Sequence, residues 1–258
     1  MTADPFVAFA ESLADAARPV AMRWFRTGIA VEDKPDASPV TLADRAVERQ
    51  LRQMIGERYP EHGILGEEQG GEGIDRELVW VLDPIDGTRA FIAGVPMFGT
   101  LIALVRDGTP VVGVIEMPAL GERFTGHAGH PTLADGRVCH TRDCGGLDHA
   151  ILSATSPEMF SGASAEAFGR LARAVKHRRY GLDCYAFALV ALGCIDLVME
   201  RDLQPYDYMA LVPVIEGAGG VITDWQGRPL GLDSTGEVLA AATPALHRAA
   251  LAVIGPLS

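Results

Sequence analysis

Apolar side chains recur every three or four residues in the first part of the chain, which is the period of an amphipathic helix. The first such run extends from Phe6 to Trp24 and predicts a helix there. A polar loop around residues 34–39 follows. Thr41 is a suitable N-cap for a second predicted helix over residues 42–58, whose apolar face would carry Val47, Leu51 and Ile55.

The pattern then changes to short apolar runs, which predict strands. Residues 78–82 form a run that ends in acid at Asp83, as expected for a buried strand. Residues 100–105 and 111–117 flank Asp107 and Gly108, a pair typical of a hairpin turn. Residues 121–149 are rich in glycine, histidine and aspartate and predict further strands and loops.

Strands and helices alternate in the second half of the chain. Strands are predicted at 151–154, 195–199, 221–222 and 238–241, and helices at 157–175, 184–192 and 206–216, with a last helix capped by Thr243. Alternation of this kind predicts an α/β (mixed α+β) fold of layered sheets and helices. No linker is evident, so we expect two subdomains, 1–145 and 146–258, packed as one body.

Composition and charge narrow the functional classes. The 258 residues are 48% hydrophobic and 22% charged, as in ordinary globular enzymes, and the formal net charge is −12. A uniformly negative protein repels nucleic acid and gains nothing from an anionic membrane, so neither partner is expected. A phosphate substrate would need bound cations or a special backbone site to offset this charge.

The cysteines and the N-terminus favour a cytoplasmic protein. No C-x-x-C pair occurs, so we expect reduced thiols at Cys139, Cys144, Cys184 and Cys194. The acidic residues Asp4, Glu11 and Asp15 do not fit a signal peptide, and no apolar run approaches the roughly 20 residues that span a bilayer.

The segment after the strand at 78–82 carries the most specific chemistry. Asp83 and Asp86 project from the strand end, with Pro84 stiffening the turn between them. Carboxylate oxygens suit Mg²⁺, and Gly87 and Thr88 would open a short helix whose N–H groups can bind an anion. A capped strand-to-helix turn without ligand is the alternative interpretation.

Two further acidic segments strengthen the first interpretation. Glu67 and Glu68 lie just upstream in a glycine-rich loop, although a solvated charge pair would explain them equally well. Asp207 lies near the start of a predicted helix, where it could simply act as a cap. Each acid alone is weak evidence, whereas the combination is specific for a site.

These motifs resemble those of the inositol-monophosphatase superfamily, and the match covers nearly the whole chain. The matching segments, in chain order, are residues 41–44 (TLAD), 66–68 (GEE), 83–88 (DPIDGT), 205–207 (PYD) and 216–220 (EGAGG). The resemblance implies a layered α/β/α/β/α fold, a homodimer and Mg²⁺-dependent phosphomonoesterase activity.

The resemblance also implies metal ligands, position by position. Glu67, Asp83 and the carbonyl of Ile85 would hold one Mg²⁺ ion, and Asp83, Asp86 and Asp207 would hold a second. A third, weaker ion would lie near Glu67 and a further acid, Asp44.

Catalytic roles follow from the same resemblance. Glu67, Asp44 and Thr88 would serve catalysis, with Thr88 positioning the attacking water, and the N–H groups of Gly87 and Thr88 would bind phosphate. Metal-activated water would attack in line, without a phosphoenzyme. This agrees with the lack of a recognisable nucleophile–base pair in the sequence.

The segments 88–104 and 205–220 most resemble the histidinol-phosphatase subgroup, which implies L-histidinol phosphate as substrate, in histidine biosynthesis. Asp183, Glu200 and Arg89 would contact it, the two acids suiting an ammonium group and an imidazole N–H. Alternatively, Asp183 caps the helix near Cys184. An inositol-1-monophosphatase, another small-ester phosphatase and a non-catalytic metal- or phosphate-binding regulator remain open.

Two other clusters are expected to be incidental. The histidines and cysteines between His127 and Cys144 fit no zinc spacing and are interpreted as solvated hairpin residues. The basic run 177–179 is interpreted as a solvated helix end, or less readily as a group that faces a neighbouring subunit's substrate.

Overall fold

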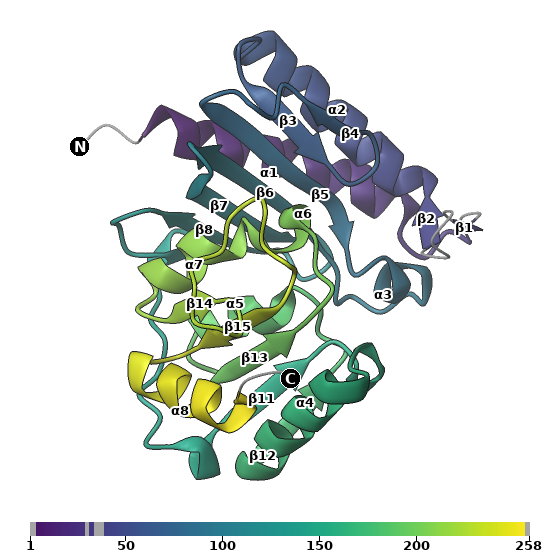
Figure 1. Ribbon diagram of the computed structural model, residues 1–258. Coiled ribbons are helices and arrows are strands. Elements are labelled where there is room, and N and C mark those ends of the chain that lie inside the picture. Colours follow the sequence, from purple (N-terminus) through teal and green to yellow (C-terminus); the bar gives the residue numbers. More distant parts are fainter. Residues whose placement is uncertain (1–3, 29–30, 34–38, 256–258) are drawn as a thin grey trace.

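The computed structural model describes residues 4–28, 31–33 and 39–255; most of the predicted polar loop at 34–39 lies outside this part. In the described part, β-strands form two large sheets and a small hairpin (Figure 1). The first large sheet has the spatial order β10-β9-β8-β7-β6-β5-β3-β4, and only the β3–β5 pair is parallel. Its strands are β3 (Gly63–Gly66), β4 (Gly70–Glu72), β5 (Leu78–Asp86), β6 (Gly99–Arg106), β7 (Thr109–Met117), β8 (Glu122–His127), β9 (Leu133–Ala134) and β10 (Arg137–Val138).

The second large sheet comes from the C-terminal part of the chain. Its order is β12-β11-β13-β15-β14, with β11 parallel to both neighbours and β15 antiparallel to both of its own. The strands are β11 (Ile151–Ala154), β12 (His177–Tyr180), β13 (Leu197–Glu200), β14 (Val221–Thr223) and β15 (Val238–Ala241). The small hairpin pairs β1 (Val31–Asp33) with β2 (Pro39–Thr41).

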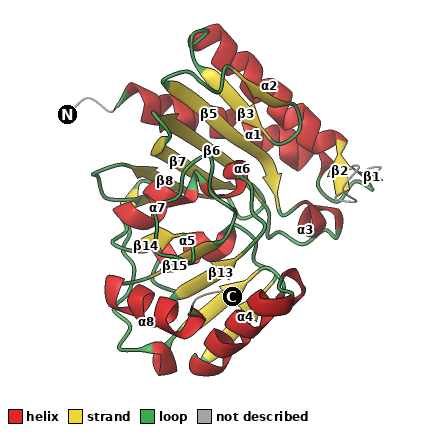
Figure 2. Ribbon diagram, in the orientation of Figure 1, coloured by secondary structure: helices red, strands yellow, loops and turns green. Residues whose placement is uncertain are grey.

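Helices cover the outer face of each large sheet and fill the space between the sheets (Figure 2). The helices α1 (Pro5–Trp24) and α2 (Leu42–Arg58) lie on the first sheet, and α4 (Gly162–Ala174) and α8 (Pro244–Ile254) lie on the second. The middle layer contains α5 (Tyr185–Ala191), α6 (Pro205–Tyr208) and α7 (Leu211–Gly217). Shorter helices are α3 (Thr88–Ile92), η1 (Leu147–His149) and η2 (Pro157–Met159). The predicted mixed, five-layered fold is confirmed.

Strand β5 shows why the layers hold together. Val79 and Val81 pack into the core between the two sheets, whereas Trp80 and Leu82 pack beneath α1 and α2. Successive side chains of a strand point to opposite faces, so a continuous apolar run serves two cores at once. Both sheets pack against the middle helical layer, so one core spans the two proposed subdomains. The subdomain boundary near residue 145 stays a prediction.

Two predictions about helices are wrong in detail. The helix expected over 206–216 is divided into α6 and α7, because Pro213 has no N–H to donate to the carbonyl of Met209. The basic run beginning at His177 is not a helix end but strand β12, which pairs with β11 at the sheet edge and exposes all four side chains. Its polarity reflects this edge position.

The glycine-rich segment before Asp83 is also more ordered than expected. Strands β3 and β4 form a hairpin around Glu67 and Glu68, and β3 pairs in parallel with β5. Within the described ranges, every helix is too short or too polar to cross a lipid bilayer.

Candidate active site

Three carboxylates meet where the first sheet faces the middle layer. Asp83 and Asp86 come from the end of β5, and Asp207 comes from α6. One oxygen of each lies within 4.8 Å of the chosen oxygens of the other two. In a regular strand, residues three apart point to opposite faces. The pairing with β6 shifts by one residue between Asp83 and Asp86, and this bulge lets both side chains reach one cluster.

The cluster is strongly acidic; Asp83 is buried, whereas Asp86 and Asp207 are half-buried. Asp83 is 2% exposed, and its Oδ1 atom has no hydrogen-bond partner among the described residues. Burial raises the pKa of Asp83 well above its usual value, and the nearby charges of Glu67, Asp86 and Asp207 raise it further. Burial likewise raises the pKa of Asp207. A buried carboxylate oxygen without a donor is costly, so this donor set fits a divalent cation such as Mg²⁺.

Asp86 and Asp207 each use one oxygen to hold a helix. The Oδ2 atom of Asp86 accepts the backbone N–H of Cys184, at the N-cap of α5, at 2.7 Å. The Oδ2 atom of Asp207 accepts the N–H of Gln204 at 2.7 Å, within the capping box of α6. The helix cap that the sequence suggested for Asp207 is therefore present. Both residues also offer a carboxylate oxygen to the cluster.

Asp44 and Thr88 lie beside the three carboxylates. Asp44 is fully buried on α2, and its Oδ2 atom accepts the N–H of Thr41 at 2.9 Å and the Thr41 hydroxyl at 2.5 Å. The Thr88 hydroxyl lies 3.1 Å from the carbonyl oxygen of Ile85 and 3.4 Å from Oδ1 of Asp44. Thr88 thus links α2 to the end of β5.

Gly87 has a conformation that only glycine adopts readily. Its φ of 83° is left-handed, and an added Cβ would lie 2.9 Å from the Met97 carbonyl oxygen. The same Cβ would lie 3.2 Å from the Asp183 side chain. The backbone at the start of α3 therefore runs directly beneath Asp183.

Asp183 and Glu200 form a second acidic group next to the first. Burial and the charge of Asp86 raise the pKa of Asp183 to about 7, while the charge of Arg89 lowers it. Glu200 ends β13, is 2% exposed, and accepts the Thr155 N–H at 2.7 Å. Burial raises the pKa of Glu200 to about 8, with smaller effects from Asp86 and Asp183. The N-cap of α5 is Cys184 and not Asp183, so the alternative assignment of Asp183 as that cap is wrong.

The structure brings Asp83, Asp86 and Asp207 into one cluster, and contacts or electrostatic effects connect the other proposed residues to it; the roles proposed for all of them stay predictions. The sequence does not indicate a role for one further residue near the site, Glu48 of α2. Its carboxylate accepts the backbone N–H groups of Glu68 and Gln69, which follow Glu67. An acid inside a helical repeat is normally a solvated side chain, and only its complete burial in the fold sets Glu48 apart.

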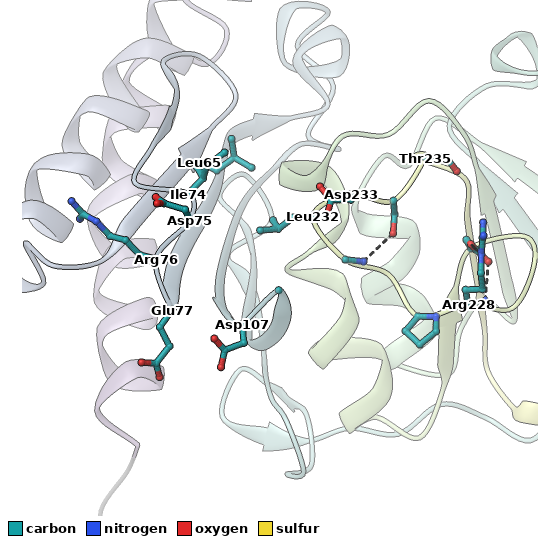
Figure 3. A pocket seen from close by; sticks show the side chains of 15 residues that line it. Leu65, Ile74, Asp75, Arg76, Glu77, Asp107, Arg228, Leu232, Asp233 and Thr235 are labelled. Atoms are coloured by element: carbon teal, nitrogen blue, oxygen red, sulfur yellow. Dashed lines mark hydrogen bonds and ion pairs between the residues drawn. The ribbon is translucent and has the colours of Figure 1, made fainter.

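A large cavity lies elsewhere. It measures about 850 Å³ and is bounded by the β4–β5 turn, the β6–β7 turn and residues 228–235 (Figure 3). These turns lie at the end of β5 opposite to Asp83 and Asp86, and no predicted site residue lines the cavity. Its arginines are engaged, Arg76 with the His62 carbonyl and Arg228 with Asp224. Size alone therefore does not locate the chemistry.

Known proteins are similar to this chain in both sequence and fold. The family model described as the inositol monophosphatase family matches residues 2–255. The chain is 48% identical to the bifunctional phosphatase IMPL2, chloroplastic, of Arabidopsis thaliana over 87% of its own length, and spans 66% of that protein. It is 34% identical to the histidinol-phosphatase of Chlorobaculum parvum, over 97% of each chain.

Solved structures agree with the sequence relatives. An inositol monophosphatase from Zymomonas mobilis superimposes with a TM-score of 0.90 at 44% identity, over 98% of this chain and 99% of that one. The converging carboxylates, the fold and these matches lead to one conclusion: the chain belongs to the inositol monophosphatase family and is a phosphoric monoester hydrolase.

Proposed function

We propose that the protein is a Mg²⁺-dependent phosphatase that hydrolyses L-histidinol phosphate to L-histidinol and phosphate, in histidine biosynthesis in the cytoplasm. The observation that carries the substrate is the pair Asp183 and Glu200, two carboxylates next to Asp86. Inositol phosphate offers only hydroxyl groups at such a position, whereas histidinol phosphate offers an ammonium group and an imidazole. Relatives named histidinol-phosphatase support this choice.

The acidic cluster would hold the cations. Glu67, Asp83 and the Ile85 carbonyl form one proposed ligand set, and Asp83, Asp86 and Asp207 form a second. A third ion, held more weakly, would lie between Glu67 and a further carboxylate, that of Asp44. When bound, Mg²⁺ supplies charge neutralisation for the phosphate and increases the acidity of water.

Thr88 and Asp44 would orient the attacking water. The Thr88 hydroxyl lies within hydrogen-bond distance of both Asp44 and the Ile85 carbonyl, and its oxygen can accept a hydrogen bond from water. Asp44 is itself fixed by two bonds from Thr41, so the pair is preorganised. Water held here would be directed at the phosphorus in line with the leaving oxygen.

The phosphate and the leaving group would lie on opposite sides of Gly87. The N–H groups of Gly87 and Thr88, at the start of α3, would bind phosphate oxygens beside the cations. Asp183 and Glu200 would accept hydrogen bonds from the ammonium and imidazole groups. Burial and Asp86 raise the pKa of Asp183 to about 7, and the positive charges of Arg89 and of a bound ammonium group would both favour its ionised form.

A phosphate-release assay with Mg²⁺ tests the substrate. It compares L-histidinol phosphate, inositol 1-phosphate, fructose 1,6-bisphosphate and adenosine 3′,5′-bisphosphate at equal concentration. We expect the highest kcat/KM for histidinol phosphate and no release in EDTA. A preference for inositol 1-phosphate would instead support the second candidate, an inositol-1-monophosphatase, which the relative ImpA of Mycolicibacterium smegmatis (36% identical) and the Zymomonas structure favour.

We also propose that the protein is a homodimer. Size-exclusion chromatography with light scattering measures this directly. The mass of a single chain is 27.5 kDa, and we expect twice that value.

A further inference from the structure

Glu48 lies outside the acidic cluster but is among the most completely partnered acids of the molecule. It is 0% exposed on α2. Its Oε2 atom accepts the N–H of Glu68 at 2.7 Å, and its Oε1 atom accepts the N–H of Gln69 at 3.0 Å and the Nε–H of Arg52 at 2.7 Å. Both oxygens are therefore used to hold the backbone that follows Glu67.

Gly66 makes this contact possible. A Cβ atom at position 66 would lie 2.3 Å from Oε1 of Glu48, closer than any side chain tolerates. The carboxylate is thus pressed against the peptide chain just before Glu67. Only glycine leaves room for it there.

The other side of the segment is fixed by β5. The N–H of Glu67 donates to the carbonyl of Leu82 at 3.2 Å, and Leu82 is followed directly by Asp83. Glu67 is therefore held between Glu48 on α2 and the strand that carries Asp83. Its carboxyl group lies close enough to raise the pKa of Asp83.

We propose that Glu48 is a positioning residue that sets the place of the Glu67 carboxylate beside Asp83, and so the affinity of the cluster for its divalent cation. This inference rests on the proposed function, in which Glu67 and Asp83 are shared ligands. Glu48 acts through the peptide groups of residues 68 and 69 and through Arg52, which also donates to the Gly70 carbonyl. Groups that orient metal ligands in this way typically change metal affinity or activity by about 10- to 100-fold when they are replaced.

The variant Glu48→Gln weakens the hydrogen bonds to residues 68 and 69 and to Arg52 while keeping the shape of the side chain. Its amide NH₂ must face either a backbone N–H or Arg52, all of which are donors, so at least one bond is lost. We expect the Kd for Mn²⁺, measured by electron paramagnetic resonance without substrate, to rise about 10- to 100-fold. The Mg²⁺ concentration for half-maximal activity should rise in parallel, with little change in the substrate KM at saturating Mg²⁺.

Asp196→Asn is the matched control. Asp196 is also 0% exposed and also accepts one backbone N–H, from Ile151 at 2.7 Å, and one arginine, Arg142 at 2.7 Å. It precedes β13 in the second sheet. We expect this variant to melt at a lower temperature yet to bind Mn²⁺ like the wild type.

A second variant covers the case in which Glu48→Gln does not fold. Gly66→Ala keeps the charge but pushes the carboxylate and the segment apart, and should weaken Mn²⁺ binding in the same direction. Wild-type Mn²⁺ affinity in the folded variants would overturn the positioning role. Failure of the wild-type protein itself to bind Mn²⁺ or release phosphate would overturn the proposed function instead.

Discussion

Asp83 is a buried acid among other acids, and both conditions disfavour its ionised form. Burial and three neighbouring acids raise its pKa, so the metal-free site is unfavourable when ionised. We expect Asp83→Asn to lower kcat/KM by more than about 100-fold, since a direct ligand should matter more than the groups that orient it. In EDTA its melting temperature should equal or exceed that of the wild type, because one buried charge is gone.

Phosphate release and differential scanning fluorimetry measure the two effects. The exposed acid Asp233 provides the control Asp233→Asn, which should leave both values unchanged. Near-normal turnover of Asp83→Asn would contradict a shared-ligand role for this residue.

Asp183 allows a clean test of substrate choice. Its φ of 47° is left-handed, a conformation that asparagine tolerates as well as aspartate, so Asp183→Asn keeps the backbone. A charged hydrogen bond is worth about 1.5–3 kcal/mol, which corresponds to about 10- to 150-fold in affinity. We expect kcat/KM for histidinol phosphate to fall by this factor, and that for a neutral ester to fall by less than about threefold. Equal losses on both esters would remove Asp183 from leaving-group recognition.

At the scale of elements, His247 couples helix α8 to the second sheet. The single hydrogen of the Thr223 hydroxyl is donated to the carbonyl of Asp224 at 2.7 Å. The Nε2 atom of His247, 2.8 Å from that hydroxyl, must therefore donate its proton to it. Burial lowers the pKa of His247, and the charge of Arg248 lowers it further.

This geometry predicts a pH dependence of stability. Because the folded-state pKa lies below the unfolded value of about 6.5, the contribution of His247 is complete above that pH and is lost as the pH falls. His247→Gln keeps a donor without titrating. Urea unfolding should show the wild type losing stability relative to the variant between pH 7.5 and 5, by at most about 1.4 kcal/mol per pH unit. A difference that is independent of pH would contradict this assignment.

Elements with a single dominant signal could be predicted from the sequence. Strand β5 was evident because both of its faces are apolar, and α2 because Thr41 and its apolar period agree. The division between α6 and α7 was also readable from Pro213, but the apolar run around it suggested one helix. Strand β12 could not be predicted, since its pairing with β11 depends on residues more than twenty positions away.

The same limit applies to the site. The proposed ligands belong to short motifs with a recognisable order, so the sequence alone is enough to propose them. The contact of Glu48 with the backbone at residues 68 and 69 depends on how α2 packs against the β3–β4 hairpin. Such long-range packing leaves no local pattern.

At the scale of the whole molecule, the acidic cluster joins the layers. Asp83 and Asp86 belong to the first sheet and Asp207 to the middle layer, and the pKa of all three carboxyl groups is raised, chiefly by burial. Without metal, the folded chain therefore binds more protons than the unfolded chain above pH 4, and its stability falls as the pH rises. A bound cation would replace those protons.

We therefore expect Mg²⁺ to stabilise the protein more at high pH. Melting temperatures in EDTA and in saturating Mg²⁺, measured at pH 5.5 and pH 8, should show the wider gap at pH 8. The stabilisation at a given excess of ligand follows its Kd, and about 100-fold excess corresponds to roughly 2.7 kcal/mol. An equal gap at both pH values would argue against cation binding by these carboxylates.

The edge strand β12 bears on whether molecules associate with one another at high concentration. Among the described strands it pairs only with β11, so one row of its backbone groups can be offered to another chain. An open edge of this kind is a template for aggregation. His177, Arg178 and Arg179 place exposed, like-charged or titratable side chains along it, so a second β12 approaching in register meets repulsion before it can form a ladder. We therefore expect the basic run to oppose edge-to-edge association of β12 at high protein concentration.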